Sequence, residues 1–147
     1  MEEFDKSIDT IVRDCIAVRV RLLNRAVTGL YDDALRPLGL KVSQLNILVA
    51  TAKLGVARPA MVCEVLHMDT STLSRNVERM RKNGWIETVA GDDGRMQPFQ
   101  LTGRGKRLLE RAFPVWREAQ REALELLGEN GVAVLSKIAG RLGMRVK

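Results

Sequence analysis

The segment from residue 59 to 102 constrains the fold more than any other part of this 147-residue chain, because punctuating residues divide it into short elements. Pro59 stands where a first helical residue would stand, and the apolar pattern behind it predicts a short helix. Residues 67–68 leave only a brief link before Asp69 or Thr70, either of which can cap a second helix. Two short helices joined by such a link are typical of a helix-turn-helix.

The second helix of this pair, over about residues 70–82, combines an apolar face with a polar face. Leu73, Val77 and Met80 recur at helical spacing and are predicted to be buried. Hydroxyl and guanidinium groups occupy the other face, and these types suit base edges and phosphates of DNA. On this helix alone, a solvated amphipathic helix with hydroxyl caps is an equally good interpretation. The candidate DNA-binding residues on it are Thr70, Ser71, Thr72, Ser74, Arg75 and Arg79.

A basic hairpin is predicted after this helix. Residues 83–84 are Asn-Gly and end the helix, because glycine adopts the left-handed conformation without a Cβ penalty. Strands are predicted at 85–90 and 96–101, joined by the turn residues 91–94. Pro98 has no backbone N–H, so it restricts the second strand to an edge position, as in an exposed two-stranded hairpin. A hairpin in this place makes the motif a winged helix-turn-helix.

Helical segments are also predicted before this centre. One amphipathic helix is predicted from about Phe4 to Tyr31, and at roughly 40 Å it is too long to cover only a small domain. Pro and Gly break the pattern at residues 36–40. Ser43 is then a plausible N-cap for a helix that stops near Leu54.

A second long helix is predicted behind the hairpin. Thr102 can cap it, and its apolar pattern continues to about Leu127. Pro114 lies inside this pattern and is expected to kink the helix. Residues 128–131 contain two glycines that break the chain again before a last short helix. The expected fold class is therefore mainly α with a small β-hairpin wing.

The charge of the chain fits an anionic partner. The formal net charge is +6 and the isoelectric point is near 9.8, as in many nucleic-acid-binding proteins. Residues 70–107 contain eight basic and four acidic residues, a net charge of +4. Most of the net charge of the chain therefore lies in and beside the predicted helix-turn-helix. That concentration favours contact with phosphate groups.

Length and motif content disfavour several classes of protein. The chain is too short for a large dinucleotide-binding enzyme and has no Gly-rich phosphate loop, nucleophile elbow or plausible acid/base pair, so neither an enzyme nor a cofactor is expected. Two cysteines and the lone His67 offer neither a secreted disulfide framework nor a metal site. Without a membrane-length apolar run or a signal peptide, a soluble cytoplasmic chain with no membrane partner is expected.

Over about residues 14–128, several pieces in register resemble the MarR family of winged-helix transcriptional regulators. They look like the core of the family's recognition helix, the end of that helix, its Asp-x-Arg wing tip, and its Leu-Thr-x-x-Gly entry to the next helix. In this sequence the pieces are Thr72-Leu73-Ser74-Arg75, Asn83-Gly84-Trp85-Ile86, Asp93-Gly94-Arg95 and Leu101-Thr102-Gly103-Arg104-Gly105.

The resemblance implies a homodimer with dimerisation helices at 1–38 and 103–147 and a winged helix-turn-helix DNA-binding domain at 39–102. Each subunit would place its recognition helix in a major groove of double-stranded DNA and its wing in the adjacent minor groove. Arg95 would enter the minor groove, held by Asp93, because a narrow A·T-rich groove attracts arginine; an ordinary exposed ion pair is the alternative. A two-fold dimer implies a pseudo-palindromic operator with half-sites about one helical turn apart. The function implied by the resemblance is usually repression, relieved when a small ligand alters the spacing of the two recognition helices.

The resemblance also suggests two kinds of signal. Many relatives bind small aromatic or phenolic anions between the dimer helices and the winged domain, where Tyr31, Asn46, Arg19 and Trp116 are conceivable lining groups; packing or surface roles are the stronger expectation for each. Some relatives sense oxidants through a cysteine near the start of the first helix. Cys15 lies in that region, but on the apolar stripe, which predicts an inert core thiol.

Cys63, in the helix that begins at Pro59, is likewise expected in the core. The leading hypothesis is therefore a sequence-specific DNA-binding regulator that acts as a ligand-responsive repressor. Three alternatives stay open. They are an architectural DNA-binding protein without effector control, a thiol-based oxidant sensor acting through Cys15, and a helical module whose basic face binds proteins or membranes. A steep salt dependence of duplex binding would separate DNA binders from the last class.

Overall fold

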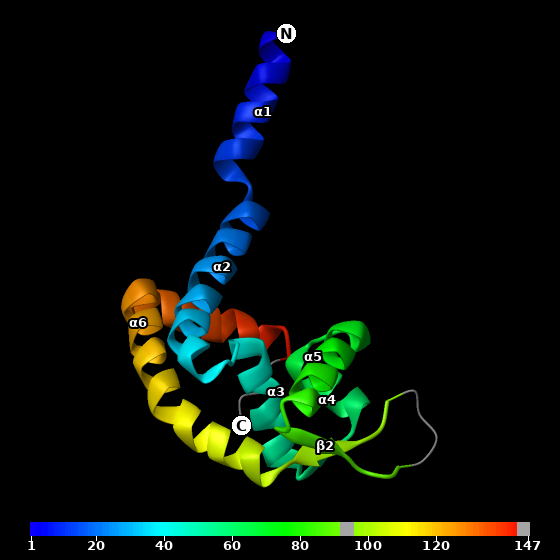
Figure 1. Cartoon of the computed structure of the whole chain (residues 1–147). Coiled ribbons are helices and arrows are strands. Elements are labelled where there is room, and N and C mark those ends of the chain that lie inside the picture. The colour runs from blue at the N-terminus through cyan, green and yellow to red at the C-terminus, as the bar shows by residue number, and fades with distance from the viewer. Residues whose placement is uncertain (92–95, 144–147) are drawn as a thin grey trace.

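The computed structural model describes residues 1–91 and 96–143 (Figure 1). Helices dominate it, and three short strands form an antiparallel sheet, in agreement with the predicted fold class. No helix within these two ranges is long and apolar enough to cross a membrane. In chain order the elements are α1 (Glu2–Asp14), α2 (Ile16–Leu35), η1 (Arg36–Leu38), α3 (Val42–Leu54), β1 (Val56–Ala57), α4 (Pro59–Leu66), α5 (Thr70–Lys82), β2 (Ile86–Thr88), β3 (Phe99–Leu101) and α6 (Gly103–Arg141).

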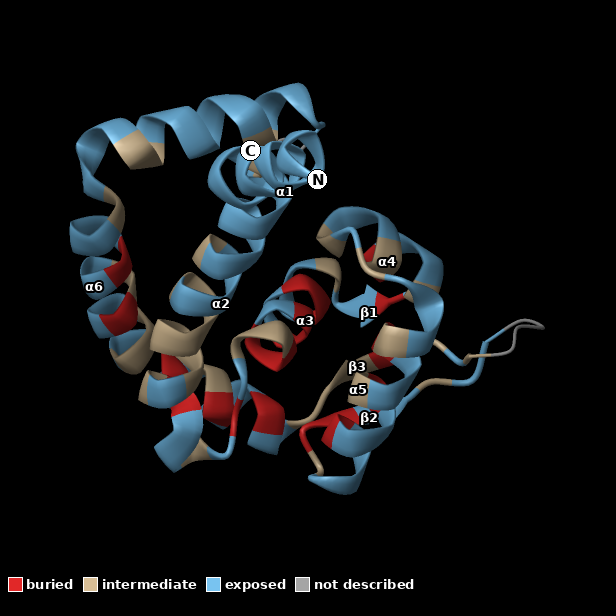
Figure 2. Cartoon of the chain, turned by 90° about the horizontal axis from the view of Figure 1, so that it is seen from above, coloured by how far each residue is buried: buried red, intermediate tan, exposed pale blue. Residues whose placement is uncertain are grey.

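The core lies in the middle of the chain. Buried residues gather on α3, α5, the sheet and the first half of α6, whereas α1 is exposed throughout (Figure 2). With few aromatic residues in the sequence, the core is mostly aliphatic around one phenylalanine. The largest fully buried side chains are Phe99, Leu35, Leu40, Ile47, Leu48, Leu73, Met80, Val62 and Thr51.

The prediction of a single N-terminal helix was wrong, because the chain forms two helices that meet at Cys15. The backbone of Cys15 is extended, with φ −64° and ψ 109°. The guanidinium of Arg19 donates to the carbonyl oxygens of Arg13 and Asp14, which the break removes from the helical hydrogen-bond ladder. This side-chain contact satisfies carbonyl groups that the end of α1 leaves free.

The N-cap predicted for α3 was also wrong, since the helix begins one residue before Ser43. Lys41 is the N-cap, and its backbone N–H donates to Oε1 of Gln44 at 3.0 Å. The backbone N–H of Val42 donates to Oδ1 of Asp32 on α2, at 2.8 Å. A carboxylate from another helix thus satisfies one of the free donors at the start of α3.

The sheet has one strand more than predicted, and its order is β1-β3-β2. Ala57 pairs with Phe99 on one side of β3, and Thr88 pairs with Phe99 on the other. The prediction that Pro98 confines its strand to an edge was therefore wrong. Pro98 precedes the first residue of β3, so the ladder needs no N–H from it, and its carbonyl accepts from Val89 N at 2.8 Å.

The junction between the sheet and α6 is close-packed. The Thr102 side chain caps α6 by accepting from the N–H of Gly105 at 3.0 Å, as predicted, and it donates to the carbonyl of Gly84 at 2.6 Å. A Cβ on Gly105 would lie 2.0 Å from the Trp85 carbonyl oxygen, so only glycine allows this approach.

Helix α6 is interrupted at a glycine, Gly128, and not at Pro114. The backbone remains helical at Pro114, and helical dihedrals are lost instead at Gly128, with φ 67° and ψ 166°. Only glycine adopts this conformation readily. The predicted break near residue 128 is confirmed, and in Figure 1 the last part of α6 turns back and passes behind α2.

Candidate nucleic-acid interface

The helix-turn-helix predicted from the sequence is confirmed in α4 and α5. The bounds of α4 match the prediction, and His67 ends it in the left-handed conformation, with φ 50° and ψ 46°. The next backbone N–H, of Met68, donates to the carbonyl of Cys63 at 3.0 Å. This compact turn brings α5 against α4, with Leu73 and Val62 fully buried between the elements of the core.

The buried stripe of α5 settles which of its residues face outward. Leu73, Val77 and Met80 are buried, as predicted. Because these three residues share one face, the polar residues between them must point away from the core. Of the six candidates on this helix, Thr72 is half-buried and the other five are exposed: Thr70, Ser71, Ser74, Arg75 and Arg79.

A hydrogen-bonded cluster organises the first turn of α5. Oδ1 of Asp69 accepts from the backbone N–H of Thr72 and from Oγ of Ser71, each at 2.7 Å. Oδ2 of Asp69 accepts from Oγ1 of Thr72 at 2.8 Å. The hydrogen bond from the Ser71 side chain, followed by those from Thr72, lowers the pKa of Asp69 to about 2. Asp69 is therefore an ionised N-cap at neutral pH.

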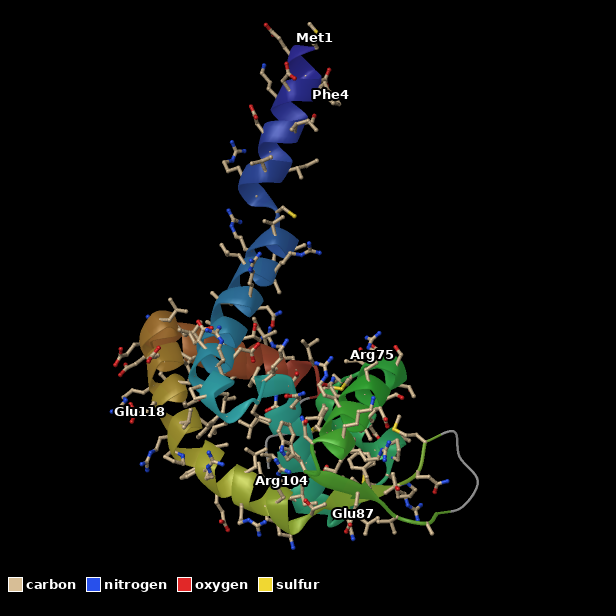
Figure 3. All side chains as sticks on the ribbon, viewed as in Figure 1. Met1, Phe4, Arg75, Glu87, Arg104 and Glu118 are labelled. Carbon is tan, nitrogen blue, oxygen red and sulfur yellow. The ribbon has the colours of Figure 1, made fainter. Side chains whose placement is uncertain are left out.

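Arg75 continues this cluster by one helical turn. Its Nη2 lies 3.5 Å from Oγ1 of Thr72, and the side chain stands on the outer side of α5, away from the core (Figure 3). An arginine in this position offers only hydrogen-bond donors, in a planar fork that matches guanine or phosphate. The structure thus brings the half-buried Thr72 and the exposed Arg75 together at the outer face of α5, whereas Leu73 between them is buried.

The cations in the last turn of α5 are arranged differently. Glu78 accepts from Nε and Nη2 of Arg81 at 3.1 and 3.0 Å, and Lys82 Nζ lies 3.8 Å from the same carboxylate. The hydrogen bond to Arg81 lowers the pKa of Glu78 and raises that of Arg81. Across the described part of the chain, the ion pairs do not involve Arg75 or Arg79, so these two guanidinium groups stay available to a ligand.

The hairpin leaves the core beside α5, on the same side of the molecule (Figures 1 and 2). Its base is fixed by the pairing of Ile86 with Leu101 and by the buried side chains of Ile86 and Phe99. The predicted minor-groove residues, Asp93 and Arg95, lie outside the described residues, so their roles stay predictions.

A groove between α3 and α6 contains two of the four conceivable effector residues. It encloses about 520 Å³ and is mostly apolar, with Asn46 and Lys53 as its polar members. Trp116 lines the other side, stacked on Phe113 with ring centroids 6.1 Å apart. The remaining lining residues are Leu45, Val49, Ala52 and Leu109.

The other two conceivable effector residues have structural contacts. The Tyr31 hydroxyl donates to Oε1 of Gln120 and so joins α2 to α6, and burial raises the pKa of Tyr31. Arg19 caps the break at the end of α1. Neither residue lines the α3/α6 groove, in keeping with the packing roles expected for them.

The two cysteines are both half-buried, but they differ in their relation to the core. Cys15 is half-buried at the junction of α1 and α2, and its neighbours Ile11 and Ile16 are exposed, so the prediction of a core thiol was wrong. The apolar stripe that carries them does not face this chain's own core. Cys63 is also half-buried, but it packs against the core, as expected. Among the residues that the structure describes, no group of His, Cys, Asp and Glu could hold a metal ion.

Comparison with known proteins places this architecture in a family. The model of the MarR family matches residues 38–96, the span from η1 to the wing. The transcriptional regulator MosR of Mycobacterium tuberculosis, crystallised in complex with DNA, is similar over 88% of this chain and 98% of its own, with 30% identity and a TM-score of 0.71. The chain belongs to the MarR family.

Two further MarR-family proteins are similar to this chain over different shares of its length. A mutant MarR from E. coli complexed with operator DNA aligns with 90% of this chain and 96% of its own, with a TM-score of 0.78 and 21% identity, which supports the fold alone. The helix-turn-helix transcriptional regulator YwoH of Bacillus subtilis is 26% identical over 86 residues. That match spans 58% of this chain and 63% of YwoH, less than two thirds of the curated relative.

Sequence reasoning missed two parts of the site. Asp69 was considered only as a cap, yet its carboxylate also accepts from both neighbouring hydroxyl groups. The Asp-x-Ser-Thr spacing was the available signal, because such side chains bond to nearby groups at helix starts. Lys53 at the α3/α6 groove was also missed, although it lies seven residues after Asn46 and therefore on the same face of α3.

Proposed function

We propose that this chain is a sequence-specific DNA-binding transcriptional regulator that acts as a homodimer. The observation that carries the proposal is the outer face of α5, where exposed hydroxyl groups and the guanidinium groups of Arg75 and Arg79 project from a rigid helix-turn-helix. The hairpin lies on the same side as this helix. The MosR and MarR structures named above contain DNA, which supports the same use of the fold here.

Dimerisation is proposed because both ends of the chain expose apolar residues at helical spacing. A contiguous exposed apolar face of this kind usually marks an interface. In a two-fold dimer the α5 helices would meet two half-sites about one helical turn apart, on an inverted repeat. The exposed residues include Ile8, Ile11, Val12, Ile16 and Leu22 at one end, and Val134, Leu135, Ile138 and Leu142 at the other.

Control by a small ligand is the finer part of the proposal. The α3/α6 groove joins an apolar wall, including Phe113 and Trp116, to the cationic head of Lys53. This combination suits a small aromatic anion, whose ring packs against the wall while its charge meets the ammonium group. Binding there would change the spacing of the two α5 helices and so relieve repression. The test is a thermal shift by benzoate that is lost in Lys53→Ala.

The deciding experiment for DNA binding is selection of bound duplexes from a random pool at about physiological salt. Enrichment of an inverted repeat by the full chain supports a specific dimeric regulator. Binding without enrichment, lost as salt rises, contradicts it and favours an architectural DNA-binding protein. No duplex binding at any salt contradicts DNA binding altogether and leaves a module for protein partners.

A further inference from the structure

The Asp69 carboxylate fixes the direction of two hydroxyl protons at the start of α5. A hydroxyl group has one proton to donate and two lone pairs to accept with, whereas an ionised carboxylate only accepts. Oγ of Ser71 lies 2.7 Å from Oδ1 of Asp69, and Oγ1 of Thr72 lies 2.8 Å from Oδ2. In both hydrogen bonds the hydroxyl must therefore be the donor.

This assignment holds over the whole physiological pH range. The pKa of Asp69 is about 2, so the carboxylate stays ionised well below neutral pH. A third hydrogen bond, from the backbone N–H of Thr72 at 2.7 Å, holds the same carboxylate in place. The protons of Ser71 and Thr72 are thus committed to Asp69, and only lone pairs remain for an external partner.

The two hydroxyl groups differ in how accessible these lone pairs are. Thr72 is half-buried, and its Oγ1 already faces Nη2 of Arg75 at 3.5 Å. Ser71 is exposed, and among the residues described its hydroxyl bonds to Asp69 alone. Ser71 is therefore the hydroxyl of this cluster that meets a ligand lying against α5.

An acceptor at this position restricts what DNA group can bind it. Phosphate oxygens, O6 and N7 of guanine, and O4 of thymine are themselves acceptors, so none of them can donate to Ser71. The exocyclic amino groups, N4 of cytosine and N6 of adenine, are the donors that the major groove offers. The nearby Asp69 charge acts in the same direction, because it repels phosphate and attracts the partly positive amino group.

We propose that Ser71 determines specificity by accepting a hydrogen bond from an exocyclic amino group, so that cytosine or adenine is preferred over guanine or thymine on the strand it faces. The proposal rests on the proposed function, that α5 reads DNA, which the DNA complex of the 30% identical MosR supports independently. Asp69 acts as the positioning residue that holds the proton away. Arg75, one turn later and a donor only, complements Ser71 by meeting acceptor groups.

The test begins with the same random-pool selection, carried out with the full chain and with three variants. Ser71→Ala removes the acceptor. Asp69→Gly removes the group that holds the Ser71 proton, and glycine is a tolerated N-cap, so the helix is retained at little cost. Ser74→Ala is the comparison variant, because it removes another exposed hydroxyl of the same DNA-binding face, and Asp69 accepts from Ser71 and Thr72 rather than from Ser74 in the described part of the chain.

The expected result is one position in each half-site where the unaltered chain prefers cytosine or adenine about fivefold or more, the size of a good base contact. Ser71→Ala should remove this preference. Asp69→Gly should reduce it to within about twofold, since the released hydroxyl then donates or accepts. Ser74→Ala should keep the preference at the Ser71-dependent position, even where it lowers overall affinity or alters another position. Circular dichroism melting checks that each variant remains folded.

A modified duplex then tests the hydrogen bond itself. The selected cytosine is replaced by 2-pyrimidinone, or the selected adenine by purine, so that only the amino group is lost. The unaltered chain should lose affinity by about fivefold or more, and Ser71→Ala should be insensitive to the change. Equal losses in both proteins, or a preference for guanine or thymine at the Ser71-dependent position, would overturn the inference.

The outcomes also separate this inference from the function on which it rests. An enriched inverted repeat in which no position responds to Ser71→Ala overturns the inference and leaves the regulator standing. If the unaltered chain enriches no sequence, the proposed function fails, and the reading by Ser71 fails with it.

Discussion

The centre of this molecule and its two ends satisfy their apolar residues in opposite ways. Between Leu35 and Ala112, apolar side chains of α3, α5, the sheet and α6 pack into one core. In α1 no residue is buried, and the end of α6 keeps Val134, Leu135 and Ile138 exposed. The same kind of helical periodicity therefore describes a finished core in one region and an open surface in the other. Periodicity reveals a buried face but does not reveal which chain buries it.

This difference assigns the two regions different tasks. The centre is held by contacts within one chain and carries the residues proposed to read DNA. Helix α1 extends away from this centre (Figure 1). A hydrogen bond from the Tyr31 hydroxyl to Gln120 joins α2 to α6. Changes in the centre should alter folding or DNA binding, and changes at the ends should alter association.

The largest expected effect contrasts two phenylalanines. Phe99 is 0% exposed at the middle of the sheet, whereas Phe4 is 68% exposed on α1. Phe99→Ala should lower the free energy of unfolding by about 3–5 kcal/mol, because it leaves a cavity in the core. Phe4→Ala should lower it by less than about 1 kcal/mol in dilute protein. Denaturant titrations measure both, and similar losses from the two changes would contradict the contrast.

The second prediction contrasts two glycines of α6. A Cβ at Gly105 would meet the Trp85 carbonyl oxygen at 2.0 Å, whereas a Cβ at Gly140 meets nothing within 4 Å. Gly105→Ala should destabilise the fold by about 3 kcal/mol or more, because the start of α6 must move away from the backbone of Trp85, just before β2. Gly140→Ala should stabilise the last helix by up to about 1 kcal/mol. Thermal melting distinguishes the two variants. An unchanged melting temperature for Gly105→Ala would contradict the close packing assigned to this junction.

The third prediction concerns binding rather than folding. Arg75→Ala should weaken binding to the selected operator by about 1–3 kcal/mol and relax preference at one position. Arg111→Ala, a matched change of an exposed arginine on α6, should leave affinity nearly unchanged. Fluorescence anisotropy measures both at fixed salt. An equal loss on all sequences would make Arg75 a phosphate contact, and an unchanged affinity would remove it from the interface.

The smallest expected effect is the acid sensitivity of the α5 cap. The folded state lowers the pKa of Asp69 from its ordinary 3.8 to about 2, so the carboxylate stabilises the fold when ionised. That contribution is fully present above about pH 4 and is lost as the pH falls through about 2. The stability difference between the unaltered chain and Asp69→Gly should therefore shrink below pH 4. A difference constant from pH 6 to pH 2 would contradict the assignment.

The elements that the sequence predicts well are those with local signals. Pro59, Asp69 and Gly84 lie at the ends of α4 and α5, and each acts through its own backbone or the next turn. The strand β1 lacked such a signal, since its two residues are defined by pairing with Phe99 and Gln100, more than forty positions away. The start of α3 likewise depends on Asp32, a residue of another helix.

The candidate site divides in the same way. The outward face of α5 followed from the buried spacing of Leu73, Val77 and Met80. The donation of the Ser71 proton to Asp69 could not be predicted in this way, because it depends on which oxygen of Asp69 each hydroxyl contacts. Cys15 was placed in a core because its stripe is apolar, and that inference assumed that the stripe is covered by its own chain.

The most direct test of this account is the mass of the protein in solution, measured by sedimentation equilibrium for the full chain and for a chain that ends at Gly128. We expect a dimer for the full chain and a folded monomer for the shortened one, because the removed segment carries Val134, Leu135 and Ile138. A stable dimer of the shortened chain would contradict the assignment of the end of α6 to the interface. A monomer of the full chain at micromolar concentration would contradict the assignment of both exposed ends to association.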